Sequence, residues 1–82
     1  MTIEQRIAAG ETALVNLIPK DRYILRRIVA CRSLINPETG KHQYSWRALA
    51  NNIGADVLAV KRWHATGIKL IQEQLEQQKD AA

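Results

Sequence analysis

The chain has 82 residues and a net charge of +4, and 46% of its residues are hydrophobic while 24% are charged. A chain of this length forms one domain that hides only about 60% of the surface its unfolded form exposes, so its core is small. This composition excludes disordered, collagen-like and low-complexity chains. No apolar run approaches the roughly 20 residues of a membrane span and no secretory signal is visible, so we expect a cytoplasmic protein.

Residues with catalytic or metal-binding chemistry are few. Cys31 is the only cysteine, so no intrachain disulfide can form. Together with His42 and His64 it supplies too few ligands for a structural zinc site. The sequence has no nucleophile beside a base, no paired carboxylates in a plausible pocket and no glycine-rich phosphate loop. We therefore expect neither an enzyme nor a protein that needs a metal or cofactor.

Charge is distributed unevenly along the chain. Residues 1–18 carry a net charge of −1, residues 19–40 carry +3, residues 41–69 carry +4 and residues 70–82 carry −2. Contact with phosphate groups depends on local rather than total charge. The basic middle is therefore typical of a small domain that faces a polyanion, although a solvated basic face without a partner is the alternative interpretation.

The first half of the chain predicts two helices. Thr2 and Gln5 have the spacing of a capping box, which starts a first helix over residues 3–17. Pro19 fits the first turn of a second, basic helix over residues 19–35, because the amide hydrogen that proline lacks would have no partner there.

Helical spacing assigns the faces of the second helix. Its inner stripe is predicted to be Ile24, Ile28, Cys31 and Ile35. The opposite side carries Arg22 and Arg26, which we expect to be solvated. Cys31 is predicted to be a buried small hydrophobe rather than a reactive thiol.

The second half predicts a loop and two further helices. A turn sequence with proline and glycine makes residues 36–44 a loop. Ser45 caps a short helix over residues 46–53, and Gly54 supplies the left-handed backbone that ends it.

The last helix is the longest. Asp56 caps it, and it runs from residue 57 to about residue 78. Its predicted inner stripe is Val60, Trp63, Gly67, Leu70, Ile71 and Gln74. No strand-like alternation appears anywhere, so the predicted fold is all-α, a single domain of four helices over residues 1–82.

The last two helices fit a helix-turn-helix over residues 45–78. Counted from Trp46 as position one, positions four, eight, fifteen and eighteen must be apolar because they pack the helices together. Position five must be small, and position nine favours glycine because the turn needs a left-handed backbone. The residues at these six positions are Leu49, Ile53, Val60, Trp63, Ala50 and Gly54, and each meets its demand.

The segment from Ser45 to Asp56, followed by Val60-Lys61-Arg62-Trp63, resembles region 4 of bacterial sigma-70 factors. Gly67-Ile68-Lys69-Leu70-Ile71 is similar to the Ala-Leu-x-x-Leu stretch that ends the recognition helix in that family. The resemblance covers about residues 21–75, and the chain is also similar to small phage and prophage helix-turn-helix proteins of unassigned function. It implies an all-helical domain that places its last helix in the major groove, although a chain without the other regions of a sigma factor is not expected to be a complete one.

The side of the last helix opposite its inner stripe is predicted to touch DNA. Arg62 is the candidate for a base contact, because a guanidinium can bond guanine O6 and N7 together. Lys61 and Lys69 are predicted to contact phosphates, and Leu58 and Ala65 to meet thymine methyl groups or a protein. The full set of predicted DNA-binding residues is Lys41, Arg47, Leu58, Lys61, Arg62, Ala65 and Lys69. Arg47 lies near a helix start and Lys41 lies beside His42 in the preceding loop, so both are expected to reach the DNA backbone.

Several residues are interpreted as packing residues. Trp46 and Trp63 are predicted to lie in the core rather than to stack on bases, and His64 to lie between the inner and outer faces. A second apolar strip on the last helix consists of Val57, Ile68 and Leu75. Either the first helix or a second copy of the chain is expected to cover it, and a homodimer would present two recognition helices to successive major grooves.

Two classes of function follow. The first is a bacterial or phage transcription regulator that binds double-stranded DNA in a sequence-specific manner. The second is an assembly module, either a phage packaging component that resembles a small terminase subunit or a partner of RNA polymerase. The apolar opening of the last helix, Val57-Leu58-Ala59, favours the second class. RNA binding through the basic second helix is a third option that lacks an aromatic platform.

Overall fold

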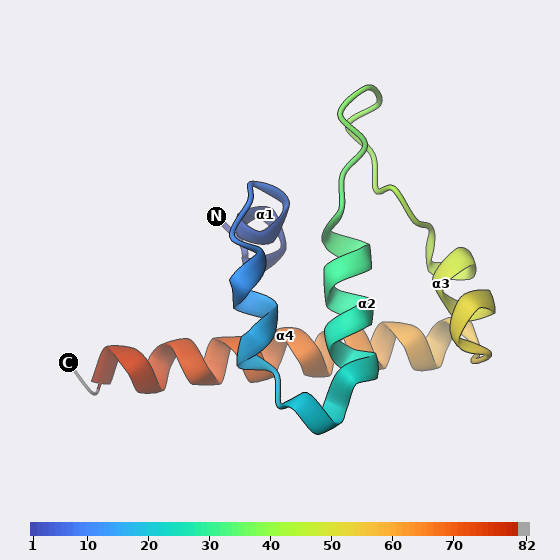
Figure 1. The fold of residues 1–82 in the computed structure, drawn as a ribbon. Helices are drawn as coiled ribbons and strands as arrows, with labels where there is room; N and C mark the ends of the chain where they lie inside the picture. The colour runs from blue at the N-terminus through green and yellow to red at the C-terminus, as the bar shows by residue number, and fades with distance from the viewer. Residues whose placement is uncertain (81–82) are drawn as a thin grey trace.

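The computed structural model describes residues 1–80, and their regular elements are all helical (Figure 1). The elements in chain order are α1 (Ile3–Ala8), the 3-10 helices η1 (Thr12–Leu17) and η2 (Lys20–Arg22), α2 (Tyr23–Ser33), α3 (Trp46–Ile53) and α4 (Val57–Asp80). The prediction of an all-α fold is confirmed. No helix within residues 1–80 is both long and apolar enough to cross a membrane.

The prediction of one continuous first helix is wrong. The capping box is present, since the Gln5 amide donates to Thr2 Oγ1 and the Thr2 amide donates to Gln5 Oε1. α1 nevertheless ends at Ala8, and η1 follows after a turn. The cause is Gly10, whose φ of +118° is a conformation that a helix cannot contain. The chain therefore folds back here, and Ile7 and Val15 enter the same hydrophobic cluster.

The second helix also begins later than predicted. Pro19 has an extended backbone, so η2 precedes α2 and the regular helix begins at Tyr23. Within α2 the buried apolar residues are Leu25, Ile28 and Val29. Ile24 and Ile35 are exposed, so the predicted inner stripe is wrong at both of its ends, whereas Ile28 is buried and Cys31 is half-buried.

The prediction that Arg26 is solvated is wrong. Its Nε donates to the Ile18 carbonyl at 2.6 Å and its Nη2 donates to the Asn16 carbonyl at 3.0 Å. The side chain is half-buried and ties the end of η1 to α2. Arg22 is exposed, as predicted.

The boundaries around α3 agree with the sequence. Ser45 Oγ accepts from the Ala48 amide at 3.1 Å, which caps α3. Gly54 has a φ of +81° and its amide donates to the Ala50 carbonyl. Asp56 Oδ1 accepts from the Ala59 amide at 2.7 Å at the start of α4. Residues 36–44 form the predicted loop, a hairpin with one isolated bridge from Ile35 to His42.

Two hydrophobic clusters lie along α4. The first joins α1, η1, α2 and α4 through Ile3, Ile7, Val15, Ile18, Leu25, Val29 and Ile71. The second joins α2, α3 and α4 through Ile28, Leu49, Ala50 and Val60. α2 crosses α4 between the two clusters. At this crossing the backbone of α4 lies close to α2. A Cβ on Gly67 would lie 2.7 Å from Val29 Cγ2 and 3.6 Å from the Leu25 carbonyl oxygen.

The inner face of α4 is rotated from the prediction. Val60, Gly67 and Ile71 are buried as expected, and Leu70 is half-buried. Trp63 is 36% exposed, whereas its neighbour His64 is only 7% exposed. Gln74 is exposed as well. The inward direction therefore passes through residue 64 rather than 63, because α1 and α3 pack on the His64 side of the helix.

Candidate nucleic-acid interface

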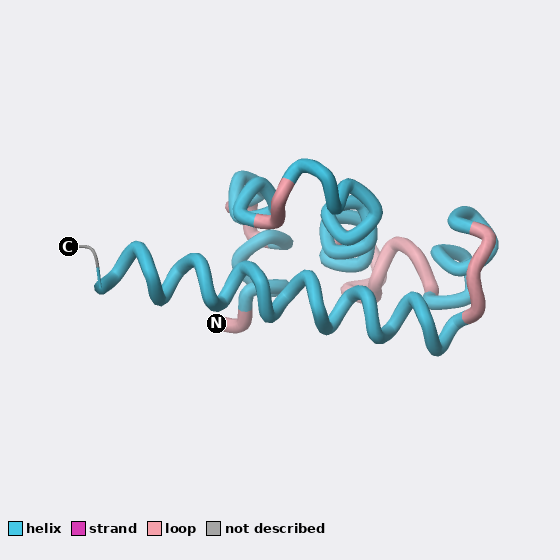
Figure 2. Tube along the Cα trace, turned by 90° about the horizontal axis from the view of Figure 1, so that it is seen from below, coloured by secondary structure: helices cyan, strands magenta, loops and turns pink. Residues whose placement is uncertain are grey.

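One face of α4 is free of the rest of the molecule. Leu58, Arg62, Ala65 and Lys69 are spaced by four, three and four residues, so their side chains follow one another along the helix. All four are exposed, and Leu58 is exposed to 60%. Lys61, beside this row, is exposed too. Figure 2 shows α2 and α3 on one side of α4 and the opposite side of its first half uncovered.

The arginines of the chain divide into two groups. Arg6 pairs with Glu11, Arg26 binds main-chain carbonyls, and Arg27 Nη2 donates to Asn52 Oδ1 at 2.6 Å. Arg32 is likewise held by the Tyr44 carbonyl. Within residues 1–80, the arginines whose guanidinium group forms no hydrogen bond or ion pair are Arg22, Arg47 and Arg62. Two of these three guanidinium groups, those of Arg47 and Arg62, therefore lie on α3 and α4.

Trp46 anchors the start of α3 through its indole ring. The Arg32 guanidinium lies 4.1 Å from the ring centroid, a cation–π distance, and Lys61 Nζ lies 5.8 Å from it. The His64 ring meets the indole edge-on with centroids 5.2 Å apart. The indole is half-buried against the second cluster, which agrees with its predicted packing role. Lys61 thus lies where the start of α3 meets the exposed face of α4.

His64 is a buried histidine without a hydrogen bond at Nε2. Burial lowers its pKa, Glu4 opposes this shift, and the neighbouring Arg32 and His42 reinforce it. The nearest carboxylate atom, Glu4 Oε1, is 3.6 Å from Nε2. Because the lowered pKa keeps the imidazole neutral at neutral pH, this contact between α1 and α4 is not an ion pair.

Acidification is expected to destabilise the fold through His64. Its pKa in the folded chain lies below the ordinary value of 6.5, so the unfolded chain takes up the proton first. The stability present above pH 6.5 should decline as the pH falls from there through the lowered pKa. Urea unfolding of wild type and of His64→Gln, measured in steps across this range, checks the effect. The same pH dependence in both proteins would contradict it.

The two predicted DNA-binding residues outside α4, Arg47 and Lys41, lie in different parts of the molecule. Arg47 is exposed in the first turn of α3, at the end of the molecule where α4 begins (Figure 1). Lys41 is exposed in the hairpin, whose tip points away from α4 in the same view. His42 Nδ1 contacts the Arg32 carbonyl at 2.7 Å. The helix that carries Arg47 thus lies beside the start of α4, whereas the hairpin that carries Lys41 points away from α4.

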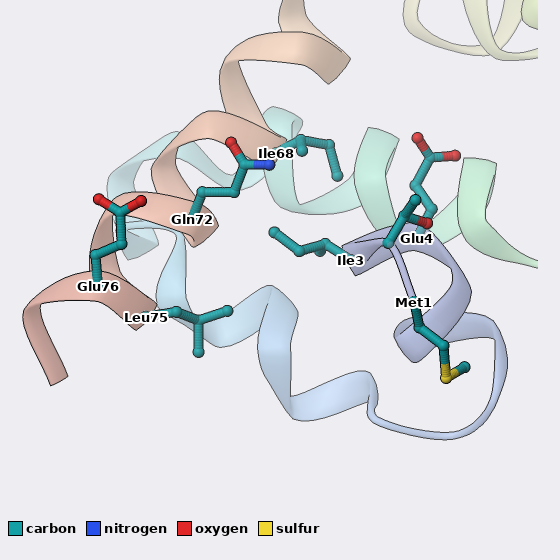
Figure 3. Close-up of a pocket in the computed structure, with 8 residues that line it drawn as sticks. Met1, Ile3, Glu4, Ile68, Gln72, Leu75 and Glu76 are labelled. Carbon is teal, nitrogen blue, oxygen red and sulfur yellow. The ribbon is translucent and has the colours of Figure 1, made fainter. Parts of the chain in front are cut away.

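α1 covers most of the second apolar strip. Ile68 and Leu75 are half-buried against the first cluster, and Figure 3 shows Ile3 of α1 extending toward them. Val57 is half-buried against the second cluster. Glu4 and Glu76 line the remaining hollow, which makes it unsuited to a polyanion. The first helix, one of the two expected covers, is therefore in place, and the strip leaves little surface for a homodimer.

Sequence reasoning missed two features near this interface. The Arg32–Trp46 contact joins residues that are 14 positions apart, and no local pattern predicts it. The surface formed by Tyr23 and Trp63 was also missed. Its signal was available, because residues 63 and 64 are almost equally compatible with the inner stripe, but the greater hydrophobicity of tryptophan favoured the wrong one.

Comparison of the chain with known protein families, with curated proteins and with solved structures found no match. Within residues 1–80, no three His, Cys, Asp or Glu side chains are placed to hold a metal ion.

Proposed function

We propose that the chain binds double-stranded DNA in a sequence-specific manner, with α3 and α4 as a helix-turn-helix and α4 in the major groove. The observation that carries the proposal is the exposed row Leu58, Arg62, Ala65 and Lys69 on the longest helix. The guanidinium group of its arginine forms no hydrogen bond or ion pair within residues 1–80. A helix of this kind fits the major groove, which is about 12 Å wide.

The packing around Gly54 supports the same proposal. The helix-turn-helix pattern requires small or apolar residues where the two helices meet, and Leu49, Ala50 and Val60 are buried there. Gly54 has the left-handed backbone that the turn demands. Trp63 is the one packing position that departs, since it faces solvent. Its place toward α3 is taken by His64, whose ring contacts Trp46.

Each exposed residue has a proposed role. Arg62 would read guanine through two parallel hydrogen bonds, while Lys61, Lys69 and Arg47 would contact phosphates. Leu58 and Ala65 would meet thymine methyl groups. On this basis, and on the resemblance to region 4 of sigma-70 factors, we propose a bacterial or phage transcription regulator without enzymatic activity. Lys41 would add a phosphate contact only on DNA that reaches the hairpin.

Binding should depend steeply on salt. Neutralising about four to six phosphates predicts that log K falls against log salt concentration with a slope of about −4 to −5. Fluorescence anisotropy with labelled duplexes measures the slope, and selection of bound sequences from a random duplex pool measures specificity. Enrichment of a motif together with this slope would support a regulator. Absence of both would remove the proposal.

An assembly or adaptor role is the second candidate, and Leu58 is the observation that favours it. A leucine that is 60% exposed at the start of a helix resembles the apolar centre of a protein contact. Such a module would act in phage packaging or on RNA polymerase. Light scattering separates phage packaging from regulation, because a ring of many subunits supports packaging whereas a monomer or dimer supports regulation.

A further inference from the structure

A group of exposed aromatic and aliphatic side chains lies beside the proposed DNA-binding face, where the start of α2 meets α4. Tyr23 is 69% exposed, and Ile24 and Trp63 are exposed beside it. Together with Leu25, these side chains line one hollow of about 340 Å³ between the start of α2 and the middle of α4. Exposed clusters of this kind mark contact surfaces, and tyrosine and tryptophan are enriched at the centres of protein interfaces.

The charges at this hollow indicate its partner. Asp21 and Arg22 both line it, and both are exposed. Neither forms an ion pair or a side-chain hydrogen bond within the part of the chain that the structure describes. In a two-fold symmetric interface, residue i of one copy faces residue j of the other, and residue j of the first copy faces residue i of the second. An apolar surface whose edge carries one free acid next to one free base is complementary to itself when that edge lies at the two-fold axis.

We propose that this hollow, which we call the Tyr23–Trp63 groove, is the interface of a two-fold symmetric homodimer. Asp21 of each copy faces Arg22 of the other near the two-fold axis, and Tyr23 and Trp63 of the two copies form the apolar parts of the interface on either side of it. A single-stranded nucleic acid fits less well, because the Asp21 carboxylate would repel its phosphates.

The dimer would also bring the two copies of α4 together. Thr66 lines the groove and its hydroxyl donates to the Arg62 carbonyl one turn earlier, so the groove and the exposed basic row adjoin on the same helix. Pairing across the groove would therefore place two basic rows on one particle. The groove is lined by seven residues, fewer than the roughly 20–30 residues per partner of a standard interface, which predicts a weak dimer.

Charge reversal tests the proposal. Asp21→Arg and Arg22→Asp should each weaken self-association in sedimentation velocity by tenfold or more, because each places like charges opposite each other. A mixture of the two single variants should form a heterodimer, because every facing pair is then opposite in charge. The double variant Asp21→Arg/Arg22→Asp should dimerise like wild type. Glu76→Arg, in the hollow beside α1, is the matched control and should leave self-association unchanged.

Two results would overturn the proposal. The first is a wild-type protein that sediments as a monomer up to about 1 mM. A Kd above this value corresponds to a binding free energy below about 4 kcal/mol, which is too little for a specific dimer. The second is a mixture of the single variants that associates no better than either variant alone. Circular dichroism of each variant checks the fold, and the exposed positions of both residues predict unchanged spectra. DNA binding is measured separately on monomeric variants, so its loss would bear on the proposed function and not on the groove.

Discussion

Ile28→Ala is expected to lower the free energy of unfolding by about 2–5 kcal/mol, the usual cost of removing a buried isoleucine side chain. Ile28 is 0% exposed and packs with Leu49 and Val60, so it joins α2 to both α3 and α4. The loss is large because small domains are stable by only about 5–15 kcal/mol in total. Equilibrium unfolding in urea measures it.

Ile24→Ala is the matched control for this prediction. Ile24 lies one turn earlier on α2 and is 37% exposed, so its replacement is expected to cost less than about 1 kcal/mol. The measurement is made at a low protein concentration, because Ile24 also lines the Tyr23–Trp63 groove. Equal losses in the two variants would mean that α2 does not present the face seen in the structure.

Gly67→Ala is expected to destabilise the protein by about 1–3 kcal/mol, even though alanine is favoured over glycine in helices by about 1 kcal/mol. The added Cβ would lie 2.7 Å from Cγ2 of Val29, which is fully buried and stiff because it is β-branched. The cost therefore arises from the crossing of α2 and α4. Ala65→Gly, on the exposed face of α4, is also expected to destabilise the protein, but only because glycine has a lower helix propensity than alanine.

A double-mutant cycle identifies the cause of the Gly67 effect. Val29→Ala removes the methyl group that the new Cβ would meet, so Gly67→Ala should cost less in a Val29→Ala background than in wild type. Unfolding free energies of the four proteins give the interaction between the two sites. Costs that simply add would show that the close contact at Gly67 is not what disfavours alanine.

Helix boundaries with a local chemical cause were predictable from sequence. Ser45 and Asp56 bond amides within three residues of themselves, and Gly54 needs only its own left-handed backbone. Gly10 acts in the same local way, but its helical spacing from Ile3 and Leu14 masked the break. The start of α2 depends on how η1 and η2 pack. A prediction based on Pro19 alone therefore began the helix too early.

The faces of the helices were less predictable, because several elements compete to cover them. Trp63 and His64 differ by 100° on α4, and only the positions of α1 and α3 decide which one is buried. The exposed row from Leu58 to Lys69 tolerates this rotation, since it lies far from both alternatives. Arg26 could not be placed, because its partners are the carbonyl groups of Asn16, which was predicted to be helical, and of Ile18, which lies between the two predicted helices.

The most direct test compares duplex affinity between two variants that lose the same charge. Lys61→Ala/Arg62→Ala removes two cations from the proposed DNA-binding face. Lys20→Ala/Lys79→Ala removes two exposed cations from η2 and from the far end of α4. For the first variant, loss of the Arg62 contact alone is expected to reduce the binding free energy by about 1–3 kcal/mol. This corresponds to roughly 5- to 150-fold weaker binding to the selected duplex. The second should bind within about threefold of wild type. Equal affinities for the two variants would contradict DNA binding through α4.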